Sequence, residues 1–569
     1  MTNDVMKRTK GIWAEHLKEG AWKSEFPSGN MFNALEDTAN QFPNFYALNF
    51  EGNKIKFKDL IKNIKHVAKC FSKLGLKKGD TVTIISPNLP QAIYSLYAVN
   101  LLGGIANMIH PMWSQAEIKR SVNKTNTKFI VILDQIFPKI AKLEWEGKPT
   151  VIITRVIDAL PAYAKPVYGM KTYKKLTLDR SKQTSVYWNE FLKTDVEGVT
   201  LPEGKGDTQA VAAIMGSGGT TGTPKWVMLT NLGLNASYIQ TYELCDYQYD
   251  LNWGWSSLAL MPIFHGYGLG LCIHAMLCLG FTVHLIAQFD FEKCISKIFK
   301  NKINMIYGIP GFFEALSRCT QIETKDLSFI KMLVSGGGKL PIKLKERVDK
   351  LLAKGNCKSQ LREAYGQTEC ICGAAINPVF DVRKGSPGIA YPDTLLKIVE
   401  PGTTKEVPIG ENGELCISGI TLMKGYLGDE EATKKALQVH ADGRTWLHTG
   451  DMFSIDGDGY LHFCQRMSRM VKIAGYNVYL TNVEEIAMEY PAVKEAVAVA
   501  VDAPVIGKKV ILYVELYNDG ADEAVVIEGI RKICHETLPE YSLPSQIVIK
   551  AIPHTPMGKP DYRTLEKGE

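Results

Sequence analysis

The sequence lacks the features that mark several common classes of protein. Its 569 residues include twelve cysteines but no Cys-x-x-Cys pair. The nearest approach, Cys370-Ile-Cys372, has no accompanying histidine or cysteine cluster with metal-ligand spacing. The first ten residues are polar and lack the apolar run of a secretion signal. We therefore expect reduced thiols and a cytoplasmic location.

Membrane-spanning segments and a strong charge excess are also missing. The longest apolar stretch, residues 269–287, contains Gly270, His274, Gly280 and His284, and it predicts a buried helix followed by a strand. The formal net charge of +6 is small for this length, which argues against a nucleic-acid partner. A chain of this size exceeds what one hydrophobic core usually supports, so two or more domains are expected.

Familiar catalytic motifs are absent as well. Met215 occupies the first glycine position of a Gly-x-Ser-x-Gly elbow around Ser217, which argues against a hydrolase of that kind. No His-Glu-x-x-His zinc motif is present. A glycine-rich run at 216–226 is not a Walker P-loop, because Pro224 precedes Lys225 where that motif requires Gly-Lys-Ser/Thr.

That run is nevertheless the most informative segment of the chain. It reads Gly-Ser-Gly-Gly-Thr-Thr-Gly-Thr-Pro-Lys-Trp. Glycines let successive backbone N–H groups approach one anion, while hydroxyls and an ammonium group offset its charge. An ordinary surface loop is the alternative. Residues 210–214 predict a short buried strand before the loop, and α/β proteins bind ligands at strand ends, so a phosphate site is favoured.

The apolar pattern predicts an α/β fold. Short apolar runs alternate with helical segments, such as the helix expected over 91–102, which is typical of mostly parallel sheets covered by helices. After about residue 395 the pattern indicates a small β-rich subdomain, and from Arg466 onward it indicates a small α+β module. The expected strands are 82–85, 129–133, 151–154, 303–307, 332–334, 395–399, 414–418, 470–473 and 496–501, with further helices at 483–488 and 527–537.

Five elements in order resemble the adenylate-forming superfamily, which includes acyl-CoA synthetases, adenylation domains of peptide synthetases and firefly luciferase. They are the 216–226 loop, Tyr365-Gly366-Gln367-Thr368-Glu369, Thr449-Gly450-Asp451, Arg466 followed by Lys472 and Gly475, and Gly558-Lys559. The resemblance covers nearly the whole chain. It implies an N-terminal AMP-binding domain (1–465) and a mobile C-terminal domain (466–569) hinged near Arg466.

The resemblance implies a two-step reaction. A carboxylate attacks the α-phosphate of ATP, pyrophosphate leaves, and the CoA thiol then attacks the acyl adenylate and releases AMP. Cations and N–H donors must offset the charge of the first step. Lys225 and the loop would hold the β- and γ-phosphates, while Glu369 and Thr220 would hold Mg²⁺. The expected nucleotide-binding residues are Ser217, Gly219, Thr220, Thr221, Gly222, Lys225, Gly336, Gly337, Gly338, Tyr365, Gly366, Gln367, Thr368, Asp451 and Arg466.

Individual roles also follow from the resemblance. Thr368 would contact the α-phosphate, Tyr365 would stack on adenine beside the backbone of 336–338, and Asp451 would bind the ribose with Arg466 nearby. For Glu369 the alternative is a solvated carboxylate at the start of a helix.

Lys559 would bridge the substrate carboxylate and an α-phosphate oxygen, and so orient the attack. The expected catalytic residues are thus Lys559, Glu369, Thr368 and Lys225. In the second step the C-terminal domain would rotate and present Lys472 and Gly475 to the pantetheine arm of CoA. His265 and Gly338 would line the acyl pocket, without an acid–base role for the histidine.

The chain departs from the family pattern at three places. Trp226 replaces the glycine that usually follows the signature lysine, which predicts altered packing at the end of the loop. Ser468 stands at the hinge where Asp or Lys is usual, and Gln465 replaces the glycine before Arg466. These hinge changes predict an altered rate or balance of domain rotation.

The substrate class is expected to be a medium- or long-chain fatty acid in an apolar tunnel. The segment 151–175 resembles an insertion of long-chain fatty acyl-CoA synthetases, and so does the triple glycine at 336–338. Peripheral membrane contact through the insertion is one interpretation, and a solvated loop is the other. The residues concerned are Tyr163, Tyr168, Tyr173 and Lys174.

Other functions are compatible with the same phosphate-binding residues. An aryl-acid CoA ligase would differ only in its pocket. A fatty acyl-AMP ligase or adenylation enzyme would stop at the adenylate or load a carrier protein. A regulatory nucleotide-binding protein would not turn over, although Lys225, Glu369, Asp451 and Lys559 together argue against this. The expected partners are the small-molecule substrates, and the chain is expected to be a monomer or a homodimer.

Overall fold

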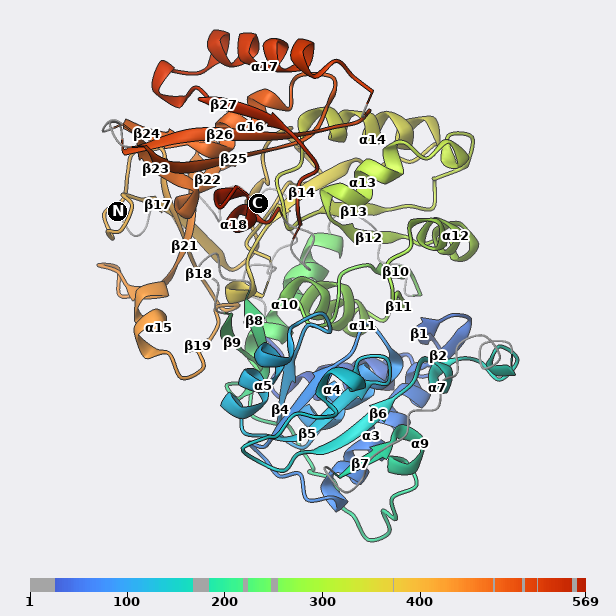
Figure 1. The fold of residues 1–569 in the computed structure, drawn as a ribbon. Helices are drawn as coiled ribbons and strands as arrows, with labels where there is room; N and C mark the ends of the chain where they lie inside the picture. The colour runs from blue at the N-terminus through green and yellow to red at the C-terminus, as the bar shows by residue number, and fades with distance from the viewer. Residues whose placement is uncertain are drawn as a thin grey trace. The chain divides into compact units, whose positions relative to one another are not determined.

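The computed structural model describes residues 26–166, 184–217, 224–246, 254–371, 373–473, 476–503, 507–518, 520–554 and 560–568. Their contacts divide the chain into two compact units. The first contains residues 1–397, 416–449 and 455–462, and the second contains 398–415, 450–454 and 463–569. Figure 1 shows the helices and strands along the chain. The expected domain boundary at 465/466 stays a prediction.

Two large sheets form most of the first unit, and helices follow their parallel strands. In spatial order the eight-stranded sheet contains β19 (Gly425–Tyr426), β9 (Lys225–Thr230), β8 (Val211–Ser217), β4 (Ile105–Met108), β3 (Thr81–Ile85), β5 (Thr127–Leu133), β6 (Thr150–Thr154) and β7 (Ser185–Tyr187). The nine-stranded sheet contains β16 (Ile389–Ala390), β15 (Ala375–Ile376), β14 (Leu361–Tyr365), β13 (Met332–Ser335), β12 (Met305–Gly308), β10 (Ser256–Ala259), β11 (Thr282–Leu285), β1 (Tyr46–Phe50) and β2 (Asn53–Lys56).

Parallel pairing dominates the middle of both sheets. Strands β8, β4, β3, β5, β6 and β7 are parallel neighbours, as are β14, β13, β12, β10, β11 and β1. Antiparallel strands lie only at the ends of these rows, as in the β8–β9 hairpin. The central strands are buried and rich in Val, Ile and Leu, which is the composition of strands covered on both faces. The predicted α/β class is confirmed.

Amphipathic and apolar helices cover these sheets. Side chains of α12, α13 and α14 share one apolar cluster with strands β10, β12, β13 and β14. The helices of the first unit are α2 (Met31–Gln41), α3 (Phe57–Lys73), α4 (Pro90–Leu101), α5 (Gln115–Lys124), α6 (Phe137–Ile140), α7 (Val156–Ala159), α9 (Trp188–Phe191), α10 (Asn231–Asp246), η2 (Tyr267–Ala275), α11 (Met276–Cys278), α12 (Phe291–Asn301), α13 (Pro310–Ser317), η3 (Thr320–Ile322), α14 (Ile342–Lys354), η4 (Thr368–Cys370) and α15 (Glu430–Ala436).

A five-stranded sheet matches the expected β-rich subdomain. Its strands are β17 (Thr394–Val399), β18 (Gly413–Gly419), β21 (Thr445–Ile455) and β20 (Leu437–Val439), with β22 (Leu461–Arg466) paired to β21.

The second unit has a compact α+β core. Helices α16 and α17 share an apolar cluster with strands β23 to β27. Arg469 forms an ion pair with the buried Glu484 and donates to the Ala498 carbonyl at 3.0 Å, so one guanidinium joins three segments of this core. The elements are η5 (Met467–Arg469), β23 (Met470–Ile473), β24 (Tyr476–Tyr479), α16 (Leu480–Ala487), β25 (Val493–Ala503), β26 (Gly507–Leu516), α17 (Glu523–Thr537), η6 (Glu540–Ser542), β27 (Gln546–Ile549) and α18 (Tyr562–Glu566).

The apolar segment 269–287 folds as a buried helix and a strand, as predicted. Its helix is η2, a π-helix that continues into α11, and its strand is β11. In the described part of the chain, every helix is too short or too polar to cross a lipid bilayer. The ten cysteines described form no disulfide with one another.

Glu243 on α10 makes stability depend on pH. The side chain is buried, and its carboxyl oxygens have no hydrogen-bond partner among the described residues. Burial, with a smaller contribution from Asp393, raises its pKa to about 8. In the unfolded chain this carboxyl has its ordinary pKa of 4.5, so the folded state binds more protons between the two pKa values. The contribution of Glu243 to the free energy of unfolding therefore falls as pH rises from about 4.5 to about 8.

Glu243→Gln is expected to raise the melting temperature above pH 8 and to leave it nearly unchanged near pH 5. The amide stays neutral, and each pKa unit corresponds to about 1.4 kcal/mol. Thermal unfolding of both proteins across about pH 5 to 9 measures the effect. A constant difference between the two proteins at every pH would contradict this account.

Candidate nucleotide and acyl site

The glycine-rich loop connects the two strands of the β8–β9 hairpin. Ser217 pairs with Lys225 in the antiparallel register, so the strand ends on either side of residues 218–223 are neighbours in the sheet. Gly219, Thr220, Thr221 and Gly222, which the sequence assigns to phosphate binding, lie outside the described residues.

Lys225 and Glu369 both contact the same tyrosine, Tyr426. The short strand β19 pairs with β9, and this places the Tyr426 ring 4.7 Å from the Lys225 ammonium. The Tyr426 hydroxyl donates to Glu369 Oε1 at 3.1 Å. Burial, together with the Glu369 carboxylate, raises the pKa of Tyr426 far above its ordinary value, so the phenol stays a donor. The three side chains place a cation and a carboxylate beside the hairpin.

Backbone hydrogen bonds hold this cluster in place. Met423 N–H donates to the Glu369 carbonyl at 2.7 Å, and Leu427 N–H donates to the Trp226 carbonyl at 2.8 Å. Glu369 lies in η4, which follows directly on the Tyr365-Gly366-Gln367 segment. A carboxylate oxygen at this point fits Mg²⁺, which prefers hard oxygen ligands.

Gln367 connects two of the recognised motifs. Its Nε2 donates to the Tyr365 hydroxyl at 3.1 Å and to the Thr449 carbonyl at 2.9 Å. Tyr365 is the last residue of β14, and its ring is therefore held at the carboxyl end of a parallel strand. Ligands of open α/β sheets bind at this edge.

The triple glycine stands at the end of the neighbouring strand. β13 pairs with β14 in parallel, so residues 336–338 follow β13 on the same edge as Tyr365. A Cβ on Gly336 would lie 3.2 Å from the Tyr267 ring, and Gly337 has a φ of +76°. These positions favour glycine. Without side chains, they leave only backbone at the edge where adenine is predicted to bind.

The residue that follows the predicted acyl-pocket residue His265 lies beside the predicted α-phosphate residue Thr368. A Cβ on Gly266 would be 3.3 Å from Thr368 Cα. The ring of His265 stands 5.5 Å from that of Phe264 and 6.3 Å from that of His110. Burial lowers the pKa of His110 to about 4, so this imidazole is neutral near pH 7.

The π-helix η2 begins two residues after His265. Its first turn packs tightly, because a Cβ on Gly268 would lie 1.8 Å from the Pro262 carbonyl oxygen. Residues 268–275 are buried. π-Helical segments occur frequently at functional sites. The residues that follow His265 are thus buried and closely packed against the segment that precedes it.

Asp451 and Arg466 lie together in the second unit. Arg466 Nε is 3.4 Å from Asp451 Oδ1, and the Asp451 side chain is almost fully buried. Both amide atoms of Gln465 are buried and have no partner among the described residues. Ser468 lies in η5 and Lys472 in β23, where its backbone pairs with Asn477. Gly475 and Lys559 lie outside the described residues.

Trp226 is a buried anchor of the hairpin. Its side chain is inside the protein, its indole N–H donates to Ser121 Oγ at 2.9 Å, and the Lys124 ammonium lies 4.7 Å from its ring. The expectation of altered packing at this position stays a prediction for the loop itself, whose residues 218–223 are not described.

Trp226→Ala is expected to lower the free energy of unfolding by about 3–5 kcal/mol, because it removes a large buried ring. Trp226→Phe keeps a six-membered aromatic ring but loses the N–H donor and the second ring of the indole, so a smaller cost of about 2–3 kcal/mol is expected. Denaturant unfolding of the three proteins provides the comparison. Equal stability of the alanine variant and the unsubstituted protein would contradict a role in anchoring.

Comparison with known proteins decides the family. Residues 35–427 match the AMP-binding enzyme family, and residues 482–559 match the AMP-binding enzyme C-terminal domain. The chain belongs to the AMP-binding enzyme family. The predicted membership of the adenylate-forming superfamily is thereby confirmed, and with it a nucleotide-binding ligase class.

Curated relatives of this AMP-binding enzyme differ in the acid they are named for. A long-chain-fatty-acid–CoA ligase of Bacillus subtilis is 29% identical over 571 residues, covering 99% of each chain. A 4-coumarate–CoA ligase of Humulus lupulus is 27% identical and covers 89% of this chain and 88% of its own. Ligation of an organic acid to CoA is supported at the level of the family.

Solved structures share the fold. The ATP-bound MatB from Rhodopseudomonas palustris has a TM-score of 0.78 at 22% identity, covering 95% of this chain and 99% of its own. The o-succinylbenzoate CoA synthetase from Bacillus subtilis in complex with its acyl-adenylate has a TM-score of 0.75 at 23% identity, covering 94% and 98%.

Sequence reasoning about this AMP-binding enzyme missed Tyr426, Tyr267 and His110. Tyr426 sits between Lys225 and Glu369 only because β19 pairs with β9, a contact between residues far apart in the chain. Tyr267 and His110 likewise gain their neighbours through the fold. No local motif around these three residues could have found them.

Proposed function

We propose that this protein is an ATP-dependent, AMP-forming acyl-CoA synthetase that acts on a medium- or long-chain fatty acid. It would form acyl-AMP with release of pyrophosphate, and then acyl-CoA with release of AMP. The observation that carries the proposal is the Lys225–Tyr426–Glu369 cluster, which supplies a cation and a carboxylate next to the glycine-rich hairpin.

The nucleotide would bind along the edge formed by β13 and β14. Tyr365 would stack on adenine beside the backbone of 336–338, and Thr368 would contact the α-phosphate. Lys225 would neutralise the outer phosphates, and ionised Glu369, oriented by Tyr426, would provide an oxygen ligand for Mg²⁺. When bound, Mg²⁺ would withdraw charge from the phosphate oxygens. This assignment is supported by the shared edge and by the hydrogen bond of Gln367 to Tyr365.

The C-terminal domain would complete the site in turn. We place the domain boundary at 465/466, with Ser468 at the hinge and Asp451 and Arg466 at the ribose. Lys559 would act in adenylation, and Lys472 and Gly475 would act in thioester formation. The Asp451–Arg466 ion pair supports a carboxylate held in position for hydroxyl groups.

The acyl group would lie next to His265 and Gly338. The adjacency of Gly266 to Thr368 supports a path from the α-phosphate to the apolar residues after His265. A fatty acid is favoured over an aromatic acid by the relative that matches 99% of the chain. The insertion residue Tyr163 is 75% exposed, as membrane contact would require, whereas Tyr168, Tyr173 and Lys174 lie outside the described residues.

Product analysis tests the proposal. Purified protein is incubated with Mg-ATP, CoA and a pool of fatty and aromatic acids, and the products are identified by mass spectrometry. Fatty acyl-CoA together with AMP is expected. Only aryl-CoA would identify an aryl-acid ligase, adenylate without thioester would identify an acyl-AMP ligase, and bound nucleotide without any product would identify a non-catalytic protein.

A further inference from the structure

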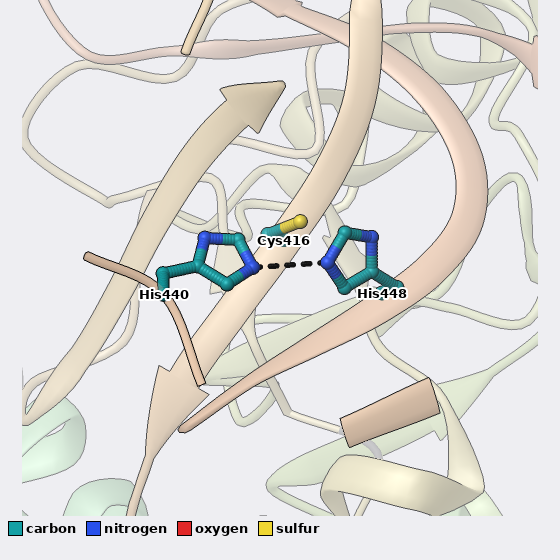
Figure 2. Close-up of side chains that lie close together, drawn as sticks. All are labelled: Cys416, His440 and His448. Atoms are coloured by element: carbon teal, nitrogen blue, oxygen red, sulfur yellow. Dashed lines mark hydrogen bonds between the residues drawn. The ribbon is translucent and has the colours of Figure 1, made fainter. Parts of the chain in front are cut away.

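A thiol and two imidazoles converge inside the five-stranded sheet. Cys416 comes from β18, His440 from the turn after β20, and His448 from β21. One ligand atom from each residue lies within 4.8 Å of the other two. Figure 2 shows both rings turned toward one another, with the Cys416 sulfur beside them. Cys416 and His440 are buried, and His448 is half-buried.

The separations in this cluster fit a tetrahedral ion after small side-chain rotations. The two Nε2 atoms are 2.9 Å apart. A zinc ion with Zn–N of about 2.0–2.1 Å and Zn–S of about 2.3 Å places its nitrogens about 3.3 Å apart and each nitrogen about 3.6 Å from the sulfur.

We propose that Cys416, His440 and His448 form a zinc-binding site. A thiolate and two neutral imidazoles are borderline-soft ligands that suit Zn²⁺ and not Mg²⁺ or Ca²⁺. Because three protein ligands leave one tetrahedral position, the fourth ligand is water, which reaches the ion on the half-buried His448 side. This site is separate from the Mg²⁺ expected at Glu369, whose carboxylate comes from η4.

The surroundings hold the ligands in place, as metal sites require. The backbone N–H of His440 donates to the Arg444 carbonyl at 3.1 Å, and this hydrogen bond closes the turn between β20 and β21. The His440 ring packs at 5.8 Å against Trp446, whose indole N–H donates to Asp442 at 3.1 Å. The Lys397 ammonium lies 4.1 Å from the centroid of the Trp446 ring, so this indole is held between a lysine and the Asp442 carboxylate.

Zinc titration of the full-length protein tests the proposal. The protein is stripped with a chelator and dialysed, and zinc is then titrated against a chromophoric competitor. One equivalent is expected to bind to the unsubstituted protein. Cys416→Ser is expected to weaken binding by at least about 10–100-fold, because it removes a direct ligand. Cys464→Ser is the matched control, since Cys464 contacts Asn412 and is expected to leave zinc affinity unchanged.

Cobalt substitution gives a readout that does not depend on affinity alone. Cobalt bound to the unsubstituted protein is expected to give a thiolate-to-metal charge-transfer band. The band is expected to persist in Cys464→Ser and to vanish in Cys416→Ser. His448→Asn, an independent variant, should weaken zinc binding even if Cys416→Ser folds poorly. Absence of stoichiometric zinc in the unsubstituted protein, or an unchanged band in a folded Cys416→Ser, would overturn the proposal.

Discussion

Glu369→Gln is expected to lower the rate of adenylate formation by about 10²–10³-fold. Glutamine has nearly the same shape, and its carbonyl oxygen can still accept the hydrogen bond from Tyr426. What it removes is the negative charge proposed to hold Mg²⁺ opposite Lys225. The loss should therefore be electrostatic and not structural. Pyrophosphate release in a single turnover measures the rate, and a magnesium titration measures the shift to higher metal concentration.

A second variant separates the effect of the Glu369 carboxylate from that of the Tyr426 hydroxyl that orients it. Tyr426→Phe keeps the ring below Lys225 and removes only the hydroxyl, so a loss of about 10-fold is expected, in line with one hydrogen bond to a charged acceptor. Melting temperatures of both variants check that the fold is retained. Normal turnover by a folded Glu369→Gln protein at low magnesium would contradict the proposed role of Glu369 in binding Mg²⁺.

Lys559→Ala is expected to reduce adenylation by about 10²–10⁴-fold and to spare the second half-reaction. The ammonium is proposed to bridge the attacking carboxylate and the α-phosphate, and orientation and charge stabilisation of this kind act in the first step. Thioester formation from synthetic acyl-AMP and CoA should then proceed at nearly the unsubstituted rate. Pyrophosphate exchange measures the first step, and acyl-CoA formation from the adenylate measures the second.

An exposed lysine near the same end of the chain provides the control. Lys567 follows α18 and is exposed, so Lys567→Ala should leave both half-reactions unchanged. ATP binding by Lys559→Ala should also persist, because Lys225 and the hairpin remain. Equal losses in both half-reactions would assign Lys559 a general structural role in place of the proposed one.

The fold was largely predictable because its local patterns agree with its tertiary contacts. The strand expected at 470–473 coincides with β23, and the helix expected at 91–102 differs from α4 by one residue at each end. Buried parallel strands carry continuous apolar runs, and such runs are readable without a structure. The type of helix at η2 was not readable, since apolar content does not distinguish α from π hydrogen bonding.

Residues of the candidate site could be proposed from the sequence only where a motif is continuous. Tyr365 and Glu369 belong to one such motif, whereas Tyr426 becomes their neighbour through the pairing of β19 with β9. The cluster of Cys416, His440 and His448 was not predicted from the sequence for the same reason. Its members lie too far apart in the chain to form a metal-ligand spacing, and sheet pairing brings them together.

The tyrosine between Lys225 and Glu369 bears on the form in which ATP would enter the proposed nucleotide site. The opposite charges of these two side chains sum to zero, so a free tetra-anion meets an ammonium and a carboxylate together. The carboxylate repels such an anion unless a divalent cation accompanies it. The cluster should consequently discriminate against uncomplexed nucleotide at the moment of entry, before any chemical step.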